Sequence, residues 1–453
     1  MLWRNTALLE LLRKEIAKKD ILILGYGREG RSSLQRIWQV KGFASVTIAD
    51  QNPVSLEAEY QSVPILSGPS YMDTLDDYDL IFKSPGIVLP KEPEEYNCLF
   101  TSQMEIFMKA YREQMIGITG TKGKSTVTTM LYHILKESKR DVVLAGNIGI
   151  PAFDILEDIG PKTFVICELS CHQLEYIHVS PRIAMLLNIH EEHLDHYGTM
   201  KKYIHSKQQI YLHQGPKDLL LCDLSILPHK SFCAAHIYTI SDCFTTADVV
   251  LSGTRIRFEQ GEYKIPAKEI HLLGHHNHID IAFDYAVCHL LGLSDEEFDA
   301  ALRTYQPLPH RLHFIGEKDQ IRYYDDSIST ICDTTIQALK SVPEVGSVLI
   351  GGMDRGIEYD ELIVFLSRHT VPYIILMADT GKRIYQEIKE KYPNFYQPER
   401  LHLVDTLEEA VQTAKKHTPS GMACILSPAA ASYGIFKNFE ERGEVFEKLV
   451  FSS

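Results

Sequence analysis

The feature that most constrains the fold is the stretch from Met115 to Met130, which reads MIGITGTKGKSTVTTM. An apolar run typical of a buried strand leads into a glycine-rich turn, a Gly-Lys-Ser sequence and residues that suit a helix. This order is typical of a phosphate-binding loop, because glycines let backbone N–H groups close around phosphate oxygens and the helix N-terminus adds partial positive charge. Ile118 stands where such loops usually begin with glycine. We expect Lys124 to reach the β- and γ-phosphates of a nucleotide and Ser125 to bind Mg²⁺.

A second glycine-rich loop, Gly25-Tyr26-Gly27-Arg28-Glu29-Gly30, follows an apolar strand predicted at residues 21–24. A helix is predicted over residues 31–38, and the next strand ends at Asp50. This spacing fits a dinucleotide-binding half-domain, and the same loop can hold any phosphate-bearing nucleotide at a helix N-terminus. Taken alone, the loop also fits a purely structural turn between strand and helix. Ser84, after the following strand, is predicted to present a free hydroxyl.

Polar residues follow the predicted strands in the middle of the chain. Asn147, Glu168 and His193 each come just after an apolar run. In an open parallel sheet, such residues line the ligand crevice at the carboxyl ends of the strands. Glu168 stands where a hard acidic ligand for Mg²⁺ is needed, and a buried glutamate with a structural partner is the alternative. Lys207 lies in a predicted helix, where a lysine is usually solvated, so chemistry alone assigns it no role. The predicted strands here are 115–118, 142–144, 164–167 and 183–187.

Composition narrows the functional classes. The 46 basic and 60 acidic side chains leave a net charge of −14, which argues against a broad nucleic-acid-binding surface. The nine cysteines form no CxxC pair, so neither a zinc site nor a disulfide framework is predicted, and reduced cytoplasmic thiols are the simplest account. Three histidines within 275–278 lack an acidic or cysteine partner at ligand spacing. No apolar run approaches the roughly 20 residues of a membrane span, and residues 1–20 lack a signal-peptide core.

The last third of the chain alternates apolar strands with helical segments, as a second doubly wound unit does. Its predicted strand-end loops are Asp325-Asp326-Ser327, Gly351–Gly356, Asp379-Thr380-Gly381-Lys382 and Ser427–Ser432. The predicted strands are 321–324, 347–350, 373–376, 401–404 and 423–426.

Length and pattern together predict three domains, because 453 residues correspond to about three units of roughly 150 residues. The predicted fold class is α/β. We expect a Rossmann-like domain over residues 1–104, a central phosphate-loop domain with a parallel sheet over 105–309, and a Rossmann-like C-terminal domain over 310–453.

These motifs, taken in order, resemble the Mur ligase family over nearly the whole chain, and are most similar to its glutamate-adding members. The resemblance rests on the segments Gly120–Thr126, Gly146–Gly149, Glu168–Ser170, Asn188–Asp195, Gly274 with His276-Asn277, His310-Arg311, Asp326-Ser327, Gly351–Gly356 and Leu426–Ser432, with Phe436–Phe439 and Glu441-Arg442-Gly443.

The resemblance implies an ATP-dependent ligase of peptidoglycan precursor synthesis. Its substrates would be UDP-N-acetylmuramoyl-L-alanine and D-glutamate, joined through an acyl phosphate with release of ADP and phosphate. ATP and Mg²⁺, as two ions, are the implied cofactors, and a cytoplasmic monomer without membrane insertion is expected. A lysine ammonium cannot bind a metal, so the resemblance also implies a carbamylated Lys207, whose oxygens would join His193 at the second ion.

The resemblance assigns site residues in four groups. Catalysis would use Lys124, Glu168, His193 and Lys207. The metal ions would be bound by Ser125, Glu168, His193 and Lys207. ATP would contact Gly120, Thr121, Lys122, Gly123, Lys124, Ser125, Thr126, Asn277, Arg311 and Asp326. The UDP-sugar would contact Gly25, Tyr26, Gly27, Arg28, Gly30, Asp50, Ser84, Asn147, Ser170 and His193. Glutamate would contact Thr330, Arg355, Ser432 and Phe439.

The chain departs from the family pattern at four positions. Ile328 replaces a lysine that helps to bind glutamate in some members, and Arg355 replaces a second family lysine. Asp280 stands for the last asparagine of a His-Asn-x-x-Asn motif, and His313 for a common glutamate after His-Arg. Two alternatives stay open: another amide ligase of this architecture, such as a sibling Mur enzyme or a folylpolyglutamate synthase, and a nucleotide-dependent dehydrogenase or nucleotide-binding switch.

Overall fold

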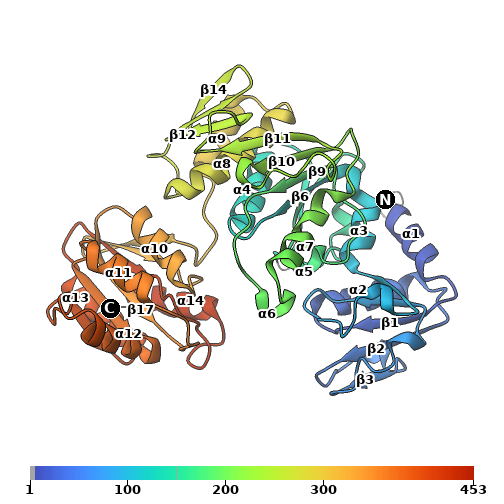
Figure 1. Cartoon of the computed structure of the whole chain (residues 1–453), viewed down its shortest axis with the longest axis horizontal. Helices are drawn as coiled ribbons and strands as arrows, with labels where there is room; N and C mark the ends of the chain where they lie inside the picture. Colours follow the sequence, from blue (N-terminus) through green and yellow to red (C-terminus); the bar gives the residue numbers. More distant parts are fainter. Residues whose placement is uncertain (1–5, 149, 453) are drawn as a thin grey trace. The chain divides into compact units, whose positions relative to one another are not determined.

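The computed structural model describes residues 6–148 and 150–452 (Figure 1). Gly149, the last residue of one family motif, lies outside the described residues. The chain divides into two compact units. The first comprises Met1–Ile265 with Ile279–Leu302, and the second Pro266–His278 with Arg303–Ser453. The predicted domain boundaries after residues 104 and 309 stay predictions.

The first unit begins with a five-stranded parallel sheet in the order β3-β2-β1-β4-β5. Its central strand β1 is apolar because helices cover parallel sheets on their faces, and α1 packs on both α2 and α3. The elements are α1 (Thr6–Ile16), β1 (Asp20–Leu24), α2 (Arg28–Val40), β2 (Ser45–Asp50), β3 (Ile65–Ser67), β4 (Leu80–Lys83), β5 (Leu99–Thr101) and α3 (Gln103–Tyr111).

A nine-stranded sheet in the order β14-β13-β12-β11-β10-β9-β6-β8-β7 fills the rest of this unit. Strands β6 to β12 are parallel to one another, and β12 to β14 form an antiparallel meander. The strands are β6 (Met115–Thr119), β7 (Val142–Gly146), β8 (Phe164–Glu168), β9 (Ile183–Leu186), β10 (Leu219–Asp223), β11 (His236–Ser241), β12 (Val249–Ser252), β13 (Arg255–Phe258) and β14 (Gly261–Lys264). The helices are α4 (Lys124–Glu137), α5 (Cys171–Leu174), α6 (Leu194–Tyr197), α7 (Met200–Leu212), α8 (His275–Leu290) and α9 (Asp295–Thr304).

The two sheets of the first unit share one hydrophobic core, which includes Ile37 of α2, Phe107 of α3 and Val165 of β8. Polar bonds add to this packing: the Ser32 hydroxyl donates to Asp154 at 2.6 Å, and Arg36 Nε donates to a backbone carbonyl at 3.0 Å. The N-terminal sheet is therefore held against the nine-stranded sheet, and its loops are fixed relative to the phosphate loop.

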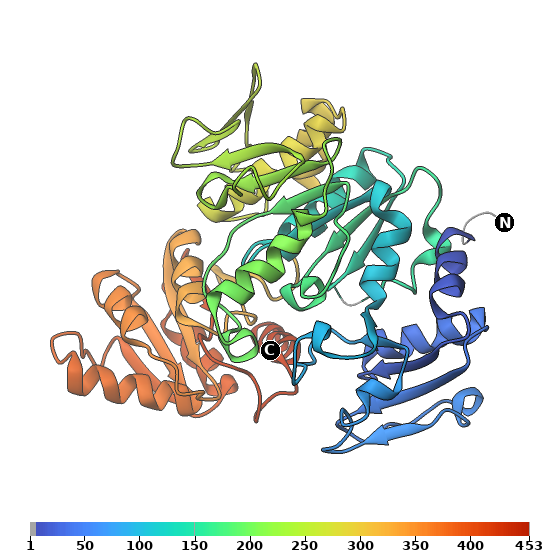
Figure 2. The ribbon, with the colours of Figure 1, turned by 45° about the vertical axis from the view of Figure 1, so that its right-hand side comes forward.

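The second unit contains a six-stranded sheet in the order β15-β16-β20-β17-β18-β19, parallel except for β15. Helices pack against it, with α12 and α13 on β17 to β19 (Figure 2). The elements are β15 (His313–Lys318), β16 (Ile321–Asp325), α10 (Cys332–Ser341), β17 (Val345–Gly351), α11 (Asp360–Arg368), β18 (Tyr373–Met377), α12 (Ala378–Lys391), β19 (Leu401–Val404), α13 (Leu407–His417), β20 (Ala423–Leu426) and α14 (Phe439–Phe451).

The predicted α/β class is confirmed, and all the predicted strands of the phosphate-loop region and of the C-terminal third are present. The loop predicted at Asp379–Lys382 is wrong, because α12 begins directly after β18. Gly381 explains the tight junction: a Cβ there would lie 2.7 Å from the Leu376 carbonyl carbon. Every helix in the described part of the chain is too short or too polar to cross a membrane.

Candidate active site

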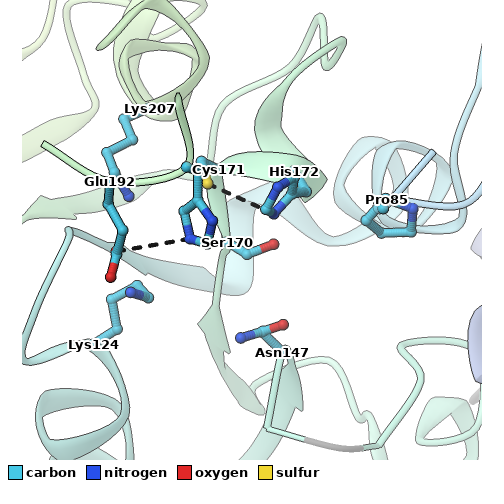
Figure 3. A pocket seen from close by; sticks show the side chains of 10 residues that line it. Pro85, Lys124, Asn147, Ser170, Cys171, His172, Glu192 and Lys207 are labelled. Atoms are coloured by element: carbon cyan, nitrogen blue, oxygen red, sulfur yellow. Dashed lines mark hydrogen bonds and ion pairs between the residues drawn. The ribbon is translucent and has the colours of Figure 1, made fainter. Parts of the chain in front are cut away.

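One cavity of about 360 Å³ in the first unit brings together five of the predicted residues: Lys124, Asn147, Ser170, His193 and Lys207 (Figure 3). They come from the ends of β6, β7, β8 and β9 and from α7, which confirms the expected convergence at the carboxyl edge of the sheet. The cavity is also lined by Pro85, Gly86, Cys171, His172 and Glu192, which the sequence did not single out.

The phosphate loop joins the buried strand β6 to α4. Gly123 adopts a left-handed φ of 82°, and a Cβ there would lie 2.6 Å from Asp280 Oδ1, so the turn requires glycine. Lys124 Nζ donates to the carbonyls of Gly120 and Thr121, both at 2.9 Å. Burial lowers the pKa of Lys124. The first turn of α4, with Ser125 and Thr126, has N–H groups that the helix cannot pair internally, as an anion site requires.

The Asn188 side chain holds this loop in place. Its Oδ1 accepts from the backbone N–H of Thr121 at 3.0 Å and of Lys122 at 2.8 Å, and its Nδ2 donates to the Lys122 carbonyl at 3.1 Å. Lys122 also forms an ion pair with Glu192 at 3.1 Å. The loop is therefore fixed by the segment after β9, which also carries His193.

Glu168 ends β8 and is 2% exposed. Its Oε1 accepts from Asn147 Nδ2 at 2.8 Å, whereas its buried Oε2 has no hydrogen-bond partner among the described residues. An unpartnered buried carboxylate oxygen is costly unless a ligand satisfies it, and a hard oxygen suits Mg²⁺. In the described part of the chain, no three His, Cys, Asp or Glu side chains are placed so that together they could hold a metal ion, so a magnesium ion here would also need hydroxyl or nucleotide oxygens.

Lys207 is brought to the phosphate loop because the chain turns back through α6 and Gly198 into α7. Its side chain is buried, with Nζ donating to the Gly120 carbonyl at 2.7 Å and lying 4.9 Å from the ring centre of Tyr203. Burial, reinforced by the positive charge of Lys124, lowers the pKa of Lys207 to about 7. A substantial fraction of this amine is therefore neutral near neutral pH.

Two histidines, His172 and His193, line the cavity, and a third, His196, packs against His172. The His172 ring lies 4.9 Å from that of His193 and 4.4 Å from that of His196. Burial lowers the pKa of His172 to about 4, so this imidazole is neutral at neutral pH, and burial also lowers the pKa of His193. Sequence reasoning missed His172; its position in α5, four residues after Glu168 at the end of β8, was the available signal.

The N-terminal glycine loop makes internal bonds that the sequence did not reveal. Asp50 accepts from the backbone N–H of Tyr26 at 2.7 Å, which orders the loop. The free hydroxyl predicted for Ser84 is wrong, because it donates to the Gly25 carbonyl at 2.9 Å. Gly30 is required, since a Cβ there would lie 2.1 Å from that same carbonyl oxygen. Of the remaining predicted residues, Gly27 precedes α2 and Arg28 begins it.

In the second unit, Asp326 is fully buried and accepts from the Ser427 hydroxyl at 2.6 Å and the Leu312 N–H at 3.1 Å. Burial raises the pKa of Asp326 to about 7, against the opposing effects of its hydrogen bonds and of Arg311. Asn277 Nδ2 donates to the Leu273 carbonyl at 2.6 Å.

Arg442 joins the loop after β16 to the loop after β20, and the predicted glutamate-binding residues lie in or next to these two loops. Buried Arg442 donates to the Ser327 carbonyl at 2.7 Å and the Ala430 carbonyl at 3.0 Å. The Ser327 hydroxyl in turn donates to the Phe439 carbonyl at 2.8 Å. Separately, Arg355 donates to the Thr330 carbonyl at 2.8 Å, and Ser432 is buried in the loop after β20.

Comparisons with known proteins agree with this site. The Mur ligase middle domain family model matches residues 118–282. The UDP-N-acetylmuramoylalanine–D-glutamate ligase of Geobacillus kaustophilus is 31% identical over 444 residues, covering 94% of this chain and 96% of that protein. That of Caldanaerobacter subterraneus is 29% identical and covers 96% and 99%.

Solved structures show the same fold. MurF from Acinetobacter baumannii has a TM-score of 0.61 at 16% identity, covering 97% of this chain and 92% of that one. MurF ligase from Thermotoga maritima, solved in complex with ADP, has a TM-score of 0.57 at 18% identity, with 97% and 99% covered. The relative from Geobacillus kaustophilus is 31% identical and covers 94% of this chain. The chain therefore belongs to the Mur ligase family.

Proposed function

We propose that this chain is the ATP-dependent ligase that adds D-glutamate to UDP-N-acetylmuramoyl-L-alanine in peptidoglycan precursor synthesis. The relatives that match it over nearly its full length carry this activity in their names. The observation that carries the proposal is the cavity in which Lys124, Asn147, Ser170, His193 and Lys207 converge beside the phosphate loop. The enzyme acts in the cytoplasm as a monomer.

The reaction has two steps. The L-alanine carboxylate attacks the γ-phosphate of ATP, which gives an acyl phosphate and ADP; the glutamate amine then attacks the acyl carbon, and phosphate leaves. Because two anions must meet in the first step, fixed positive charge has to offset their repulsion. Lys124, whose ammonium lies against the carbonyls of the phosphate loop, supplies that charge to the transferring phosphate.

The residues around the cavity also fit magnesium. Ser125 and Glu168 would hold one ion, and His193 with a carbamylated Lys207 a second; bound Mg²⁺ neutralises phosphate charge during transfer. The unpartnered Oε2 of Glu168 supports the first assignment. For the second, the lowered pKa of Lys207 supplies the neutral amine that combines with CO₂ to give a carbamate and a proton.

We carry the substrate contacts over from the family resemblance as part of this proposal. Asn147, Ser170 and His193 hold the sugar-linked end of UDP-N-acetylmuramoyl-L-alanine, while Ser84, Asp50 and the loop Gly25–Gly30 hold its UDP end. In the second unit, Asn277, Arg311 and Asp326 contact ATP, and Thr330, Arg355, Ser432 and Phe439 contact D-glutamate.

The test is phosphate release by the purified protein with each substrate omitted in turn. We expect release only when ATP, Mg²⁺, UDP-N-acetylmuramoyl-L-alanine and D-glutamate are all present. Release that ignores the UDP-sugar would contradict the proposal, and a bound nicotinamide spectrum after gentle purification would favour a dehydrogenase instead.

A further inference from the structure

A buried ionic network lies behind the cavity, outside the residues that the proposed reaction uses. Glu175, just after α5, forms an ion pair with Lys83 at 3.5 Å, and the two side chains are 13% and 5% exposed. Both oxygens of Glu175 also lie 3.2 Å from His196 Nε2. One carboxylate thus binds a lysine from the end of β4 and a histidine from α6.

The two partners of Glu175 lead to opposite sides of the cavity. Lys83 directly precedes the Ser84–Gly86 loop, whose Pro85 and Gly86 line the cavity. His196 lies in the same short helical segment that begins after His193. Figure 3 shows Pro85 across the cavity from Glu192, the neighbour of His193. Glu175 therefore links the loop of the N-terminal sheet to the segment after β9.

Lys83 also lies over the ring of Tyr176, with Nζ 5.2 Å from the ring centre, and its hydrogen bonds to backbone carbonyls are long. Its Nζ lies 3.5 Å from the Ser84 carbonyl and 3.4 Å from the Pro85 carbonyl, both at the long limit of a hydrogen bond. Burial lowers the pKa of Lys83, and the charge of Glu175 is the largest effect that opposes this shift. Without Glu175, a buried ammonium would lose its ion-pair partner, and such a charge is costly to leave unpaired. Lys83 would then move toward water and displace the loop that follows it.

We propose that Glu175 is a positioning residue that fixes the Ser84–Gly86 loop against the His193 segment, and so sets the width of the UDP-sugar part of the cavity. This inference rests on the proposed function. It assigns Glu175 no contact with substrate: its effect passes through Lys83 on one side and His196 on the other.

The experiment compares Glu175→Gln, Lys83→Met and the double variant in the full-length protein. Glutamine keeps the shape of Glu175 but loses its charge. We expect the KM for UDP-N-acetylmuramoyl-L-alanine to rise about tenfold in each single variant, since small displacements of a positioning group have effects of this order or larger. The KM for ATP should stay at the parent value. In the double variant the loss should stay below the product of the two single losses, because both changes break the same ion pair.

The control is Glu92→Gln, which removes an exposed ion pair with Lys202 at 2.6 Å. This pair joins the segment between β4 and β5 to α7. We expect no change there, as exposed pairs contribute little. A lower kcat in both single variants with both KM values unchanged would mean a smaller folded fraction, and would overturn the inference. The inference would also be overturned if the rise in KM in the double variant equals the product of the rises in the two single variants. If Glu175→Gln does not fold, Lys83→Met alone decides through the same KM comparison. Absence of activity in the parent protein would instead refute the proposed function.

Discussion

Asn188 gives a sharp test of how the phosphate loop is held. Asn188→Ala removes three hydrogen bonds, from the Thr121 and Lys122 N–H groups and to the Lys122 carbonyl. At about 0.5–1.5 kcal/mol each, these sum to between about 1.5 and 4.5 kcal/mol. Asn188 is only half-buried, so water replaces part of the loss, and we expect a cost of about 2 kcal/mol. If this free energy is lost from ATP binding, because the loop must be ordered around the nucleotide, the KM for ATP rises about 30-fold.

A second substitution separates loop order from charge. Asn188→Asp keeps the oxygen that accepts from the two N–H groups but loses the donor to the Lys122 carbonyl, and it adds negative charge beside the nucleotide phosphates. We expect this variant to melt closer to the parent temperature than Asn188→Ala, yet to bind ATP worse because of electrostatic repulsion.

The assay is steady-state phosphate release with ATP varied and the other substrates saturating, alongside thermal unfolding of each variant. Asn394→Ala, at an exposed position of the second unit, is the matched control and should behave as the parent. A parent-like KM for ATP in Asn188→Ala would refute the claim that Asn188 shapes the loop.

Three further predictions concern charged side chains. Lys124→Ala should fold normally and lose at least about a hundredfold in turnover, since it removes positive charge from the transferring phosphate; near-normal phosphate release would refute this role. Lys207→Ala should be inactive and partly rescued by acetate, which supplies the missing oxygens, whereas Lys207→Arg should stay inactive with or without acetate. Because the pKa of Lys207 is about 7 and the carbamate forms from the neutral amine, parent activity should rise as the pH increases from 6 to 8; an active Lys207→Arg variant would contradict the assignment. The pKa of Asp326 is raised from an ordinary 3.8 to about 7 in the folded protein. Between pH 3.8 and about pH 7, folded Asp326 therefore keeps a proton that the unfolded chain has released. The free energy of unfolding should consequently fall as the pH rises through this window. Asp326→Asn should flatten that slope in urea unfolding at pH 5 and 7.5, and an unchanged slope would contradict it.

Sequence reasoning located most of the elements whose apolar runs are continuous, although β10 at Leu219–Asp223, a buried apolar run, carried no prediction. Strands β1, β6 and β8 are buried along nearly their whole length, so their residues read as short apolar runs before a glycine or an acid. Strand β11, at His236–Ser241, carried no prediction, because its first half is only partly buried and its residues are mixed. The start of α12 was misread as a loop, since Asp, Thr and Gly in a row are typical of turns.

The site was predictable in type but not in detail. The Gly-Lys-Ser loop and Glu168 follow from local pattern and strand ends. The position of Lys207 against the Gly120 carbonyl does not, because it depends on the reversal of the chain between α6 and α7. Likewise, no spacing rule brings His172 to His193, which meet because β8 and β9 belong to one sheet, or Glu175 to Lys83, which meet only where the two sheets of the first unit pack together.

The most direct test of the central claim is to identify the product that the purified protein makes from ATP, Mg²⁺ and UDP-N-acetylmuramoyl-L-alanine with a panel of D- and L-amino acids. Chromatography with mass detection would follow the extended UDP-sugar while phosphate release is counted. We predict one phosphate for each D-glutamate added, and no extension with L-glutamate or the neutral amino acids. Extension by another amino acid in preference to D-glutamate, or phosphate release without an extended UDP-sugar, would contradict the claim.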